Sequence, residues 1–159
     1  MVISDIMKYK SKVMAKLIEC PEVFQLIDNR EITSSDELIN KNIFSRMRVP
    51  DTSDTVKNYI CFDIRARGSS YNDLYKNITV NVVIICHEGD IATPWGNRHD
   101  VLAGVIIDLF NWSNFLGLEL ELLSDDEDIM EKKFNIRTLQ FKNLVLNSIQ
   151  NGVKVNGIK

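Results

Sequence analysis

The sequence predicts an α+β fold: a mostly antiparallel sheet of about four strands, one helix packed across it, and further helices at the N-terminus. Three observations predict this class. Four short segments, 59–66, 77–86, 118–122 and 133–137, alternate apolar and polar residues with the period of a half-buried strand. A helical stripe directly follows the most apolar of these strands. Helical periodicity also runs through 3–29, before every predicted strand.

The length and composition predict one folded domain. The chain has 159 residues, and 45% of them are hydrophobic, which is enough to bury a single core. We expect residues 1–142 to form this domain, with helices in 3–29 and the core in 59–142. Residues 143–159 are expected to be a C-terminal tail, or an arm that becomes ordered on a partner.

Charge and cysteine content argue against several functional classes. The 19 basic and 22 acidic residues give a net charge of −3, with both signs mixed, so we expect no sequence-specific binding of nucleic acid. The N-terminus is charged and no apolar run approaches the roughly 20 residues that span a bilayer, so no membrane partner is expected. Cys20, Cys61 and Cys86 lack CxxC spacing and are expected to be buried, reduced thiols.

The first predicted element is an amphipathic helix over 3–18. Its polar side carries three lysines, Lys8, Lys12 and Lys16. Such a helix can lie on a membrane, but acidic and neutral residues on the same side favour docking on its own domain. Pro21 cannot continue this helix and suits the first turn of a second one.

The central strands follow a long, irregular connection over 42–58. The segment 59–66 is expected to have one apolar face, whereas 77–86 is apolar on one side throughout and partly on the other, as in an interior strand. The linking loop, 67–77, is too long and polar for a tight turn. We therefore expect it to project from the body of the domain.

The central helix is predicted to begin after Asn97, which occupies the N-cap position, with Asp100 three residues later. An apolar stripe runs through 101–110. Gly104, in mid-helix, suggests that a second surface packs closely on this helix, and that surface could belong to another subunit. Trp112 is expected to lie in the core.

Two further strands, 118–122 and 133–137, are predicted to form a hairpin closed by the acidic segment 124–131. This segment lacks the alternating ligands and the central glycine of an EF-hand loop. A solvated turn explains it better than a calcium site.

The candidate catalytic and metal-binding residues have simpler structural explanations. Cys86, His87 and His99 could suggest zinc, but two of them are adjacent on a strand and point to opposite faces. Cys61 or Cys86 with His99 and Asp100 could suggest a thiol hydrolase, but no nucleophile turn is present. We therefore expect no metal and no cofactor.

The best indication of an enzyme is the E-x-K pair of Glu131 and Lys133, with Glu119 and Glu121 on the preceding predicted strand. Restriction-type nucleases use such a set on adjacent strands to hold magnesium and activate water. A charged outer face of a hairpin explains the pair without chemistry, and we expect no catalytic activity.

The order of predicted elements resembles that of a family of phage proteins. It is similar to the small α/β proteins that form hexameric rings in the neck and at the head-proximal end of the tail of tailed bacteriophages, the tail terminators and head-tail joining proteins. The segments YICFDIRARGSSYNDLYKNITVNVVIICH and NRHDVLAGVIIDLFNWS resemble their strand pair and core helix. The resemblance covers roughly residues 40–142.

This resemblance implies a structural virion protein, assembled in the cytoplasm of the bacterial host. It would be a subunit of a homohexameric ring that terminates the tail tube or joins tail to head. Its partners would be copies of itself and adjoining neck or tail-tube proteins. It would have neither an active site nor a cofactor.

Two loops are expected to make the contacts of such a ring. The projecting loop contributes Arg67, Tyr71 and Tyr75, and the loop entering the central helix contributes Trp95 and Arg98. An aromatic residue beside an arginine is typical of protein contacts. Two alternatives stay open: a metal-dependent nuclease that uses the E-x-K pair, and a small non-viral adaptor that binds one host protein.

Overall fold

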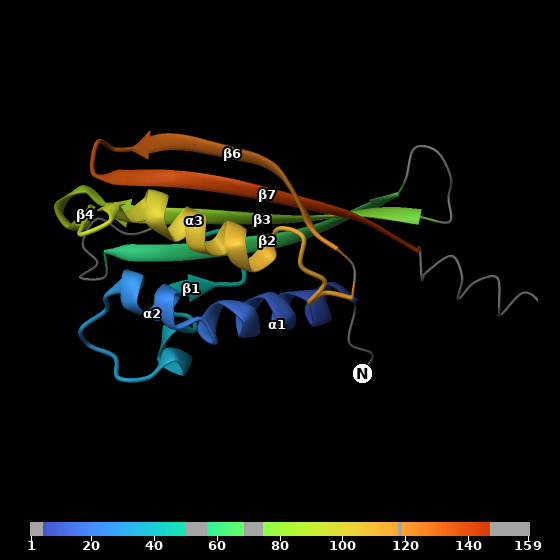
Figure 1. Cartoon of the computed structure of the whole chain (residues 1–159), viewed down its shortest axis with the longest axis horizontal. Helices are drawn as coiled ribbons and strands as arrows, with labels where there is room; N and C mark the ends of the chain where they lie inside the picture. Colours follow the sequence, from blue (N-terminus) through green and yellow to red (C-terminus); the bar gives the residue numbers. More distant parts are fainter. Residues whose placement is uncertain (1–4, 50–56, 69–74, 118, 147–159) are drawn as a thin grey trace, which may run out of the picture.

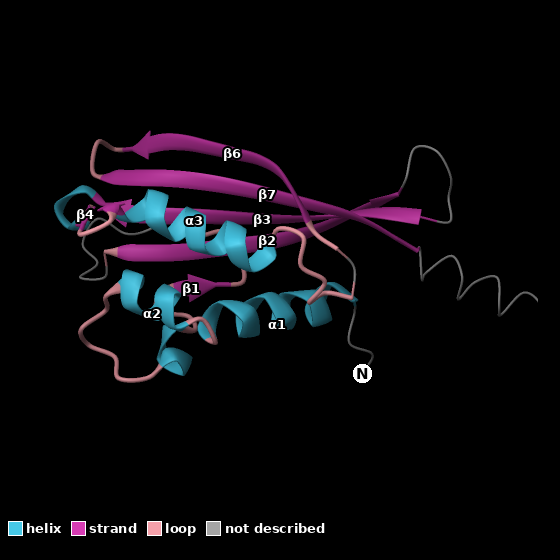
Figure 2. Cartoon of the chain, in the orientation of Figure 1, coloured by secondary structure: helices cyan, strands magenta, loops and turns pink. Residues whose placement is uncertain are grey.

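The computed structural model describes residues 5–49, 57–68, 75–117 and 119–146. These residues form two layers, a five-stranded sheet and a layer of helices on one of its faces (Figure 1, Figure 2). The predicted α+β class is confirmed, with five strands in the sheet instead of about four and a second, two-stranded sheet beside it.

The helical layer contains α1 (Asp5–Ile18), α2 (Pro21–Ile27) and α3 (Arg98–Phe110), and the 3-10 turns are η1 (Ser35–Leu38) and η2 (Glu88–Asp90). Pro21 stands in the first turn of α2, where its missing N–H costs no hydrogen bond. Asn97 is the N-cap residue of α3, as predicted. None of the described helices is long and apolar enough to cross a membrane.

The main sheet has the order β1-β2-β3-β7-β6. Its strands are β1 (Ile43–Phe44), β2 (Asn58–Gly68), β3 (Tyr75–His87), β6 (Glu121–Met130) and β7 (Phe134–Leu146), and the small sheet pairs β4 (Ala92–Thr93) with β5 (Gly96–Asn97). All neighbours in the main sheet are antiparallel except β1 and β2. The last described strand, β7, is therefore inserted between β3 and β6.

The acidic segment 124–131 is not the predicted turn. Most of it belongs to β6, an edge strand, and the chain reverses after Met130. Glu131 and Lys132 take positive φ values of 54° and 58°, as the primed turns of hairpins require. Charged residues are also typical of edge strands, because they prevent another strand from pairing. The acidic residues of an exposed edge strand therefore gave this segment the composition of a solvated turn.

The core lies between the sheet and the helices. Alternate residues of β2, β3 and β7 face α1, α2 and α3, and the fully buried ones include Ile60, Phe62, Val80, Val82, Ile84, Leu139 and Phe141. The helices contribute Val13, Leu17, Val23, Leu102, Ile106 and Phe110. Each such side chain stabilises the fold by roughly 1.5 to 3 kcal/mol through its burial.

Trp112 is not part of this core. Its side chain is 65% exposed, and its φ is 59°, just beyond the end of α3. The core position is taken instead by Phe110, whose ring packs against Phe115 and Phe141. Nothing among the described residues packs closely at Gly104, since an added Cβ would meet no atom within 4 Å. Its neighbour Ala103 is buried in the common core, where α2 packs on α3. A surface of another subunit at Gly104 stays a prediction.

No described helix covers the second face of the sheet. A small apolar cluster of Phe44, Tyr59, Cys61, Ile85 and Phe134 lies at one end of this face. The segment after β1 folds over it, with Arg46 and Arg48 above the Phe44 ring.

The rest of this face is polar, and hydrogen bonds cross three of its strands. Asn81 on β3 donates to the carboxylate of Asp63 on β2 at 2.7 Å and accepts from Gln140 on β7 at 2.9 Å. The three residues are direct cross-strand partners. We call this face, with its polar row, the open face of the sheet.

Candidate functional site

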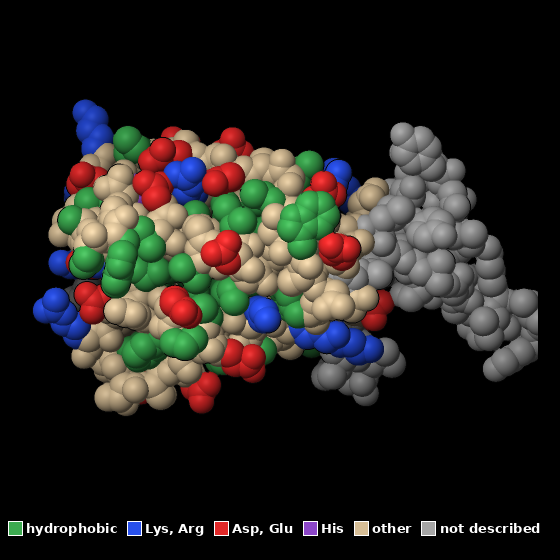
Figure 3. Space-filling view, viewed as in Figure 1, with side chains coloured by type: hydrophobic (Ala, Val, Ile, Leu, Met, Phe, Trp, Pro, Cys, Tyr) green, Lys and Arg blue, Asp and Glu red, His purple; other side chains and the backbone are tan. Residues whose placement is uncertain are grey.

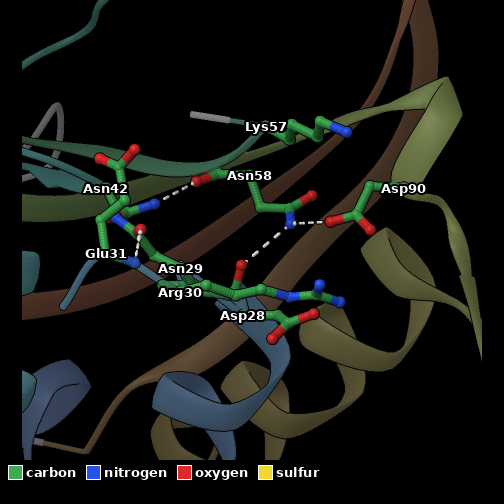
Figure 4. Close-up of a pocket in the computed structure, with 9 residues that line it drawn as sticks. Asp28, Asn29, Arg30, Glu31, Asn42, Lys57, Asn58 and Asp90 are labelled. Atoms are coloured by element: carbon green, nitrogen blue, oxygen red, sulfur yellow. Dashed lines mark hydrogen bonds between the residues drawn. The ribbon is translucent and has the colours of Figure 1, made fainter. Parts of the chain in front are cut away.

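A polar pocket of about 270 Å³ lies where the end of α2 meets the beginning of β2 and η2 (Figure 4). Its lining consists of Ile27, Asp28, Asn29, Arg30, Glu31, Asn42, Lys57, Asn58 and Asp90. Acidic and basic side chains are both present, so the pocket has no strong preference for one sign of charge.

Two buried asparagines connect the walls of this pocket. The Asn58 side chain is 2% exposed, and its Nδ2 donates to the carbonyl oxygen of Ile27 at 2.9 Å and to the Asp90 carboxylate at 2.8 Å. Asn42 donates to the carbonyl oxygen of Asn58 at 2.9 Å and accepts from Asn29 at 2.8 Å. The last carbonyls of a helix lack partners within the helix, so the bond from Asn58 to Ile27 satisfies one carbonyl at the end of α2.

Arg98 belongs to the same structural network and is not a surface residue. It is only 7% exposed. Its guanidinium donates to the carbonyl oxygens of Asp90 and Leu26, and Nη2 lies 3.7 Å from the Asp90 carboxylate. The Arg98 guanidinium, which was predicted to contact a partner, thus bonds to groups of its own chain. Its contacts connect the first turn of α3 to α2 and η2.

A second polar cluster joins the beginning of α3 to β6 and β7. Nε2 of the buried His99 lies 2.7 Å from Glu127 and 3.4 Å from Asp100. Arg137 pairs with Asp125 at 2.7 Å and also contacts Asp100. The hydrogen bond to Asp125 raises the pKa of Arg137. A guanidinium is charged at physiological pH even without this rise.

This cluster contains the one group of described residues with the geometry of possible metal ligands. The ligand atoms of His99, Asp100 and Glu127 lie within 4.8 Å of one another. Arg137 already contacts Asp100, and the His99 ring already contacts Glu127, so a cation would have to compete with both contacts. Neither Cys86 nor His87 belongs to the group, and the His87 ring instead accepts from the N–H of Gly89 at 2.9 Å.

The cysteines do not form the set that a thiol hydrolase needs. Burial raises the pKa of Cys86 to about 12, so it carries no thiolate at neutral pH. Burial also raises the pKa values of Cys20 and Cys61. All three cysteines are buried and unpaired, as predicted.

The E-x-K pair is not assembled with other carboxylates. Glu131 and Lys133 lie in the turn after β6, whereas Glu121 begins that strand. A strand of this length separates its ends by about 30 Å. The residues weighed for a nuclease therefore do not converge on one metal ion.

The remaining predicted contact residues are distributed over two ends of the fold. Arg67 is exposed near the end of β2, while Tyr71 and the side chain of Tyr75 lie outside the described residues. Trp95 is 64% exposed at the tip between β4 and β5. Gly96 permits this tip, since its φ of 134° is a value that other residues rarely adopt. Their role in binding a partner stays a prediction.

Sequence reasoning did not find the pocket or the cluster around Arg137. An asparagine at the start of an apolar strand, such as Asn58, was the available signal for the first, because a buried amide requires partners. The second joins residues far apart in the sequence, which no local pattern indicates.

Comparison with known protein families identifies the model described as YomW, which matches residues 6–143. The match extends from α1 into β7 and so includes nearly all of the described fold. The name is of the kind given to gene products of a Bacillus phage of the SPBc2 type, which makes this a phage-associated protein. A search of curated proteins finds none that matches the chain.

Proposed function

The chain belongs to the YomW family, and from its association with phages we propose that it is a structural virion protein. Its role is that of a ring-forming subunit at the phage neck or at the head-proximal end of the tail, where it terminates the tail tube or joins tail to head. The ring consists of copies of this chain, and adjoining neck or tail-tube proteins contact its two sides. Assembly takes place in the cytoplasm of the bacterial host.

One observation carries this proposal: the described helices all lie on one face of the sheet and leave the open face for contacts. The strands β2, β3 and β7 also continue beyond the helical layer at one end (Figure 1). A subunit of a ring needs contacts with two neighbours and with the parts above and below it, so a large share of its surface must bind other proteins.

The polar clusters of the chain fit this role better than catalysis. Their side chains bond mainly to one another and to the ends of helices, as in the pocket beside α2 and in the cluster around Arg137. They hold the helices on the sheet. A rigid scaffold of this kind suits a building block that repeats around an axis.

The test is to delete the gene from a phage that encodes this chain and to examine the lysate by electron microscopy. A terminator should leave overlong tail tubes when it is lost, because nothing then stops tube growth. A joining protein should leave full heads and tails of normal length that stay separate. In addition, mass spectrometry of purified particles should find the chain in stoichiometric amounts.

Two results would refute the proposal. One is infectious particles of normal shape from the deletion phage. The other is the complete absence of the chain from purified particles while it is abundant in the infected cell.

A further inference from the structure

Two elements on opposite sides of the molecule, α1 and β6, carry opposite net charges. The helix α1 has four lysines and one acidic residue within its 14 residues, whereas β6 has five acidic residues and no basic one within its 10. The strand β6 is one edge of the sheet, and α1 packs against β2 near the other edge. Figure 3 shows mostly red side chains along β6 at the top, with blue ones over α1 lower in the view, where red ones from neighbouring segments also occur.

On each side, part of the charge is available to a partner. Lys8 and Lys12 are exposed on the outward side of α1; Lys12 makes no ion pair within the described residues, and Lys8 makes one long contact, of 3.9 Å, with Asp5. On β6, Asp126 and Asp128 are exposed and make no ion pair with any described residue. Asp125 and Glu127, on the other face of the strand, already contact Arg137 and His99.

The distance between the two lysines matches the distance between the two aspartates. Lys8 and Lys12 are four residues apart on a helix, which places them about 6 Å apart along the axis. Asp126 and Asp128 are two residues apart on a strand, which places them about 6.7 Å apart. Both ammonium groups of one helix can therefore meet both carboxylates of one strand at the same time.

The edge strand favours a helix over another strand as its partner. If the same strand of a second copy paired with it, the two rows of carboxylates would repel each other, which disfavours pairing of edge strands. Leu123 and Ile129 lie on the same strand and are 52% and 64% exposed. Leu123 precedes and Ile129 follows the two aspartates along the strand, so exposed apolar area flanks the charges at this edge.

We propose that α1 of one subunit docks on the β6 edge of the next, with Lys8 and Lys12 paired to Asp126 and Asp128. This inference rests on the proposed function, because it identifies the surface through which the ring subunits associate. The two surfaces differ and lie on opposite sides of one chain. A contact of this kind repeats from copy to copy and closes into a ring if the rotation permits.

The test measures the mass of the purified full chain by light scattering after size exclusion, over a range of concentrations. The wild-type chain should self-associate, and more weakly as added salt shortens the screening length from about 10 Å at 0.1 M to about 3 Å at 1 M. K8E/K12E and D126K/D128K should each weaken association at least about tenfold, since like charges then face each other.

Mixing the two variants provides the decisive step. In the mixture, each altered helix meets an altered edge and each normal helix meets a normal edge, so association should return. The fourfold variant with both pairs reversed should also associate by itself. As a matched control for K8E/K12E, K41E/K142E makes the same change of net charge at two other exposed lysines and should associate like the wild type.

Three results would overturn the inference: a wild-type chain that stays monomeric at every concentration, association that neither variant weakens, or a loss that neither mixing nor the fourfold variant reverses. A variant that merely fails to fold would not regain association on mixing. The proposed function fails separately, through the particles of the deletion phage. Rings held together by other surfaces would refute this contact and leave the virion role intact.

Discussion

Replacing Arg98 by alanine should destabilise the protein far more than its position beside an exposed loop suggests. The change removes two hydrogen bonds from a charged group to carbonyl oxygens and leaves the Asp90 carboxylate without its cation. Hydrogen bonds to charged groups are each worth about 1.5 to 3 kcal/mol, and water can reach part of Asp90, so we expect a loss of about 3 kcal/mol.

Urea denaturation followed by circular dichroism measures this loss. For a domain of this size, about 3 kcal/mol should lower the unfolding midpoint by roughly 1 to 3 M. Arg67→Ala is the matched control, because this arginine is exposed near the end of β2 and should change the free energy of unfolding by less than about 0.5 kcal/mol. Introducing Asp90→Asn together with Arg98→Ala should restore part of the stability by removing the uncompensated charge.

The reasoning would be refuted by a loss below about 1 kcal/mol for Arg98→Ala, or by equal losses at the buried and the exposed arginine. In either case, the guanidinium would not be the group that holds α2 against the beginning of α3.

Three further predictions concern the core and the open face. Between pH 7 and 9, Cys86 should react with a thiol reagent only after the protein unfolds, because it is buried. Its pKa is raised to about 12 in the folded protein, so its contribution to stability is complete below the pKa of the unfolded chain and is lost as the pH rises toward 12. Denaturation at several alkaline pH values measures this loss. Phe110→Ala should cost about 3 to 5 kcal/mol and Trp112→Ala less than about 0.5, since only the first side chain is buried; equal thermal shifts would contradict this. Asn81→Ala should cost about 1 to 3 kcal/mol in urea denaturation, because it interrupts the polar row of the open face; an unchanged midpoint would show that the row adds no stability.

The sequence was sufficient to predict those strands and helices in which one face is buried, because burial of one face leaves a regular apolar pattern. The alternation in β2, β3 and the first part of β7 indicated half-buried strands, and the stripe after Asn97 indicated a helix packed on them. Residues typical of helix starts were also informative, since Pro21 marked the beginning of α2 and Asn97 the beginning of α3.

Other features depend on partners that are distant in the sequence. The order of the strands could not be predicted, because β7 pairs with β3 across the whole of α3 and β6. Arg98 appeared to be a surface residue because nothing nearby indicated that the carbonyl of Leu26 would accept its hydrogen bond. Trp112 appeared to be a core residue because hydrophobicity alone does not say that the helix has ended two residues earlier.

The central place of β7 has a consequence for how the chain folds during synthesis. One side of β3 pairs with β2 through a local hairpin, but its other side must wait until Val80 can meet Phe141. Contacts between residues so far apart in the sequence form slowly. Until the ribosome has delivered β7, one edge of the apolar strand β3 therefore stays without its final partner, and such an edge can pair with other chains.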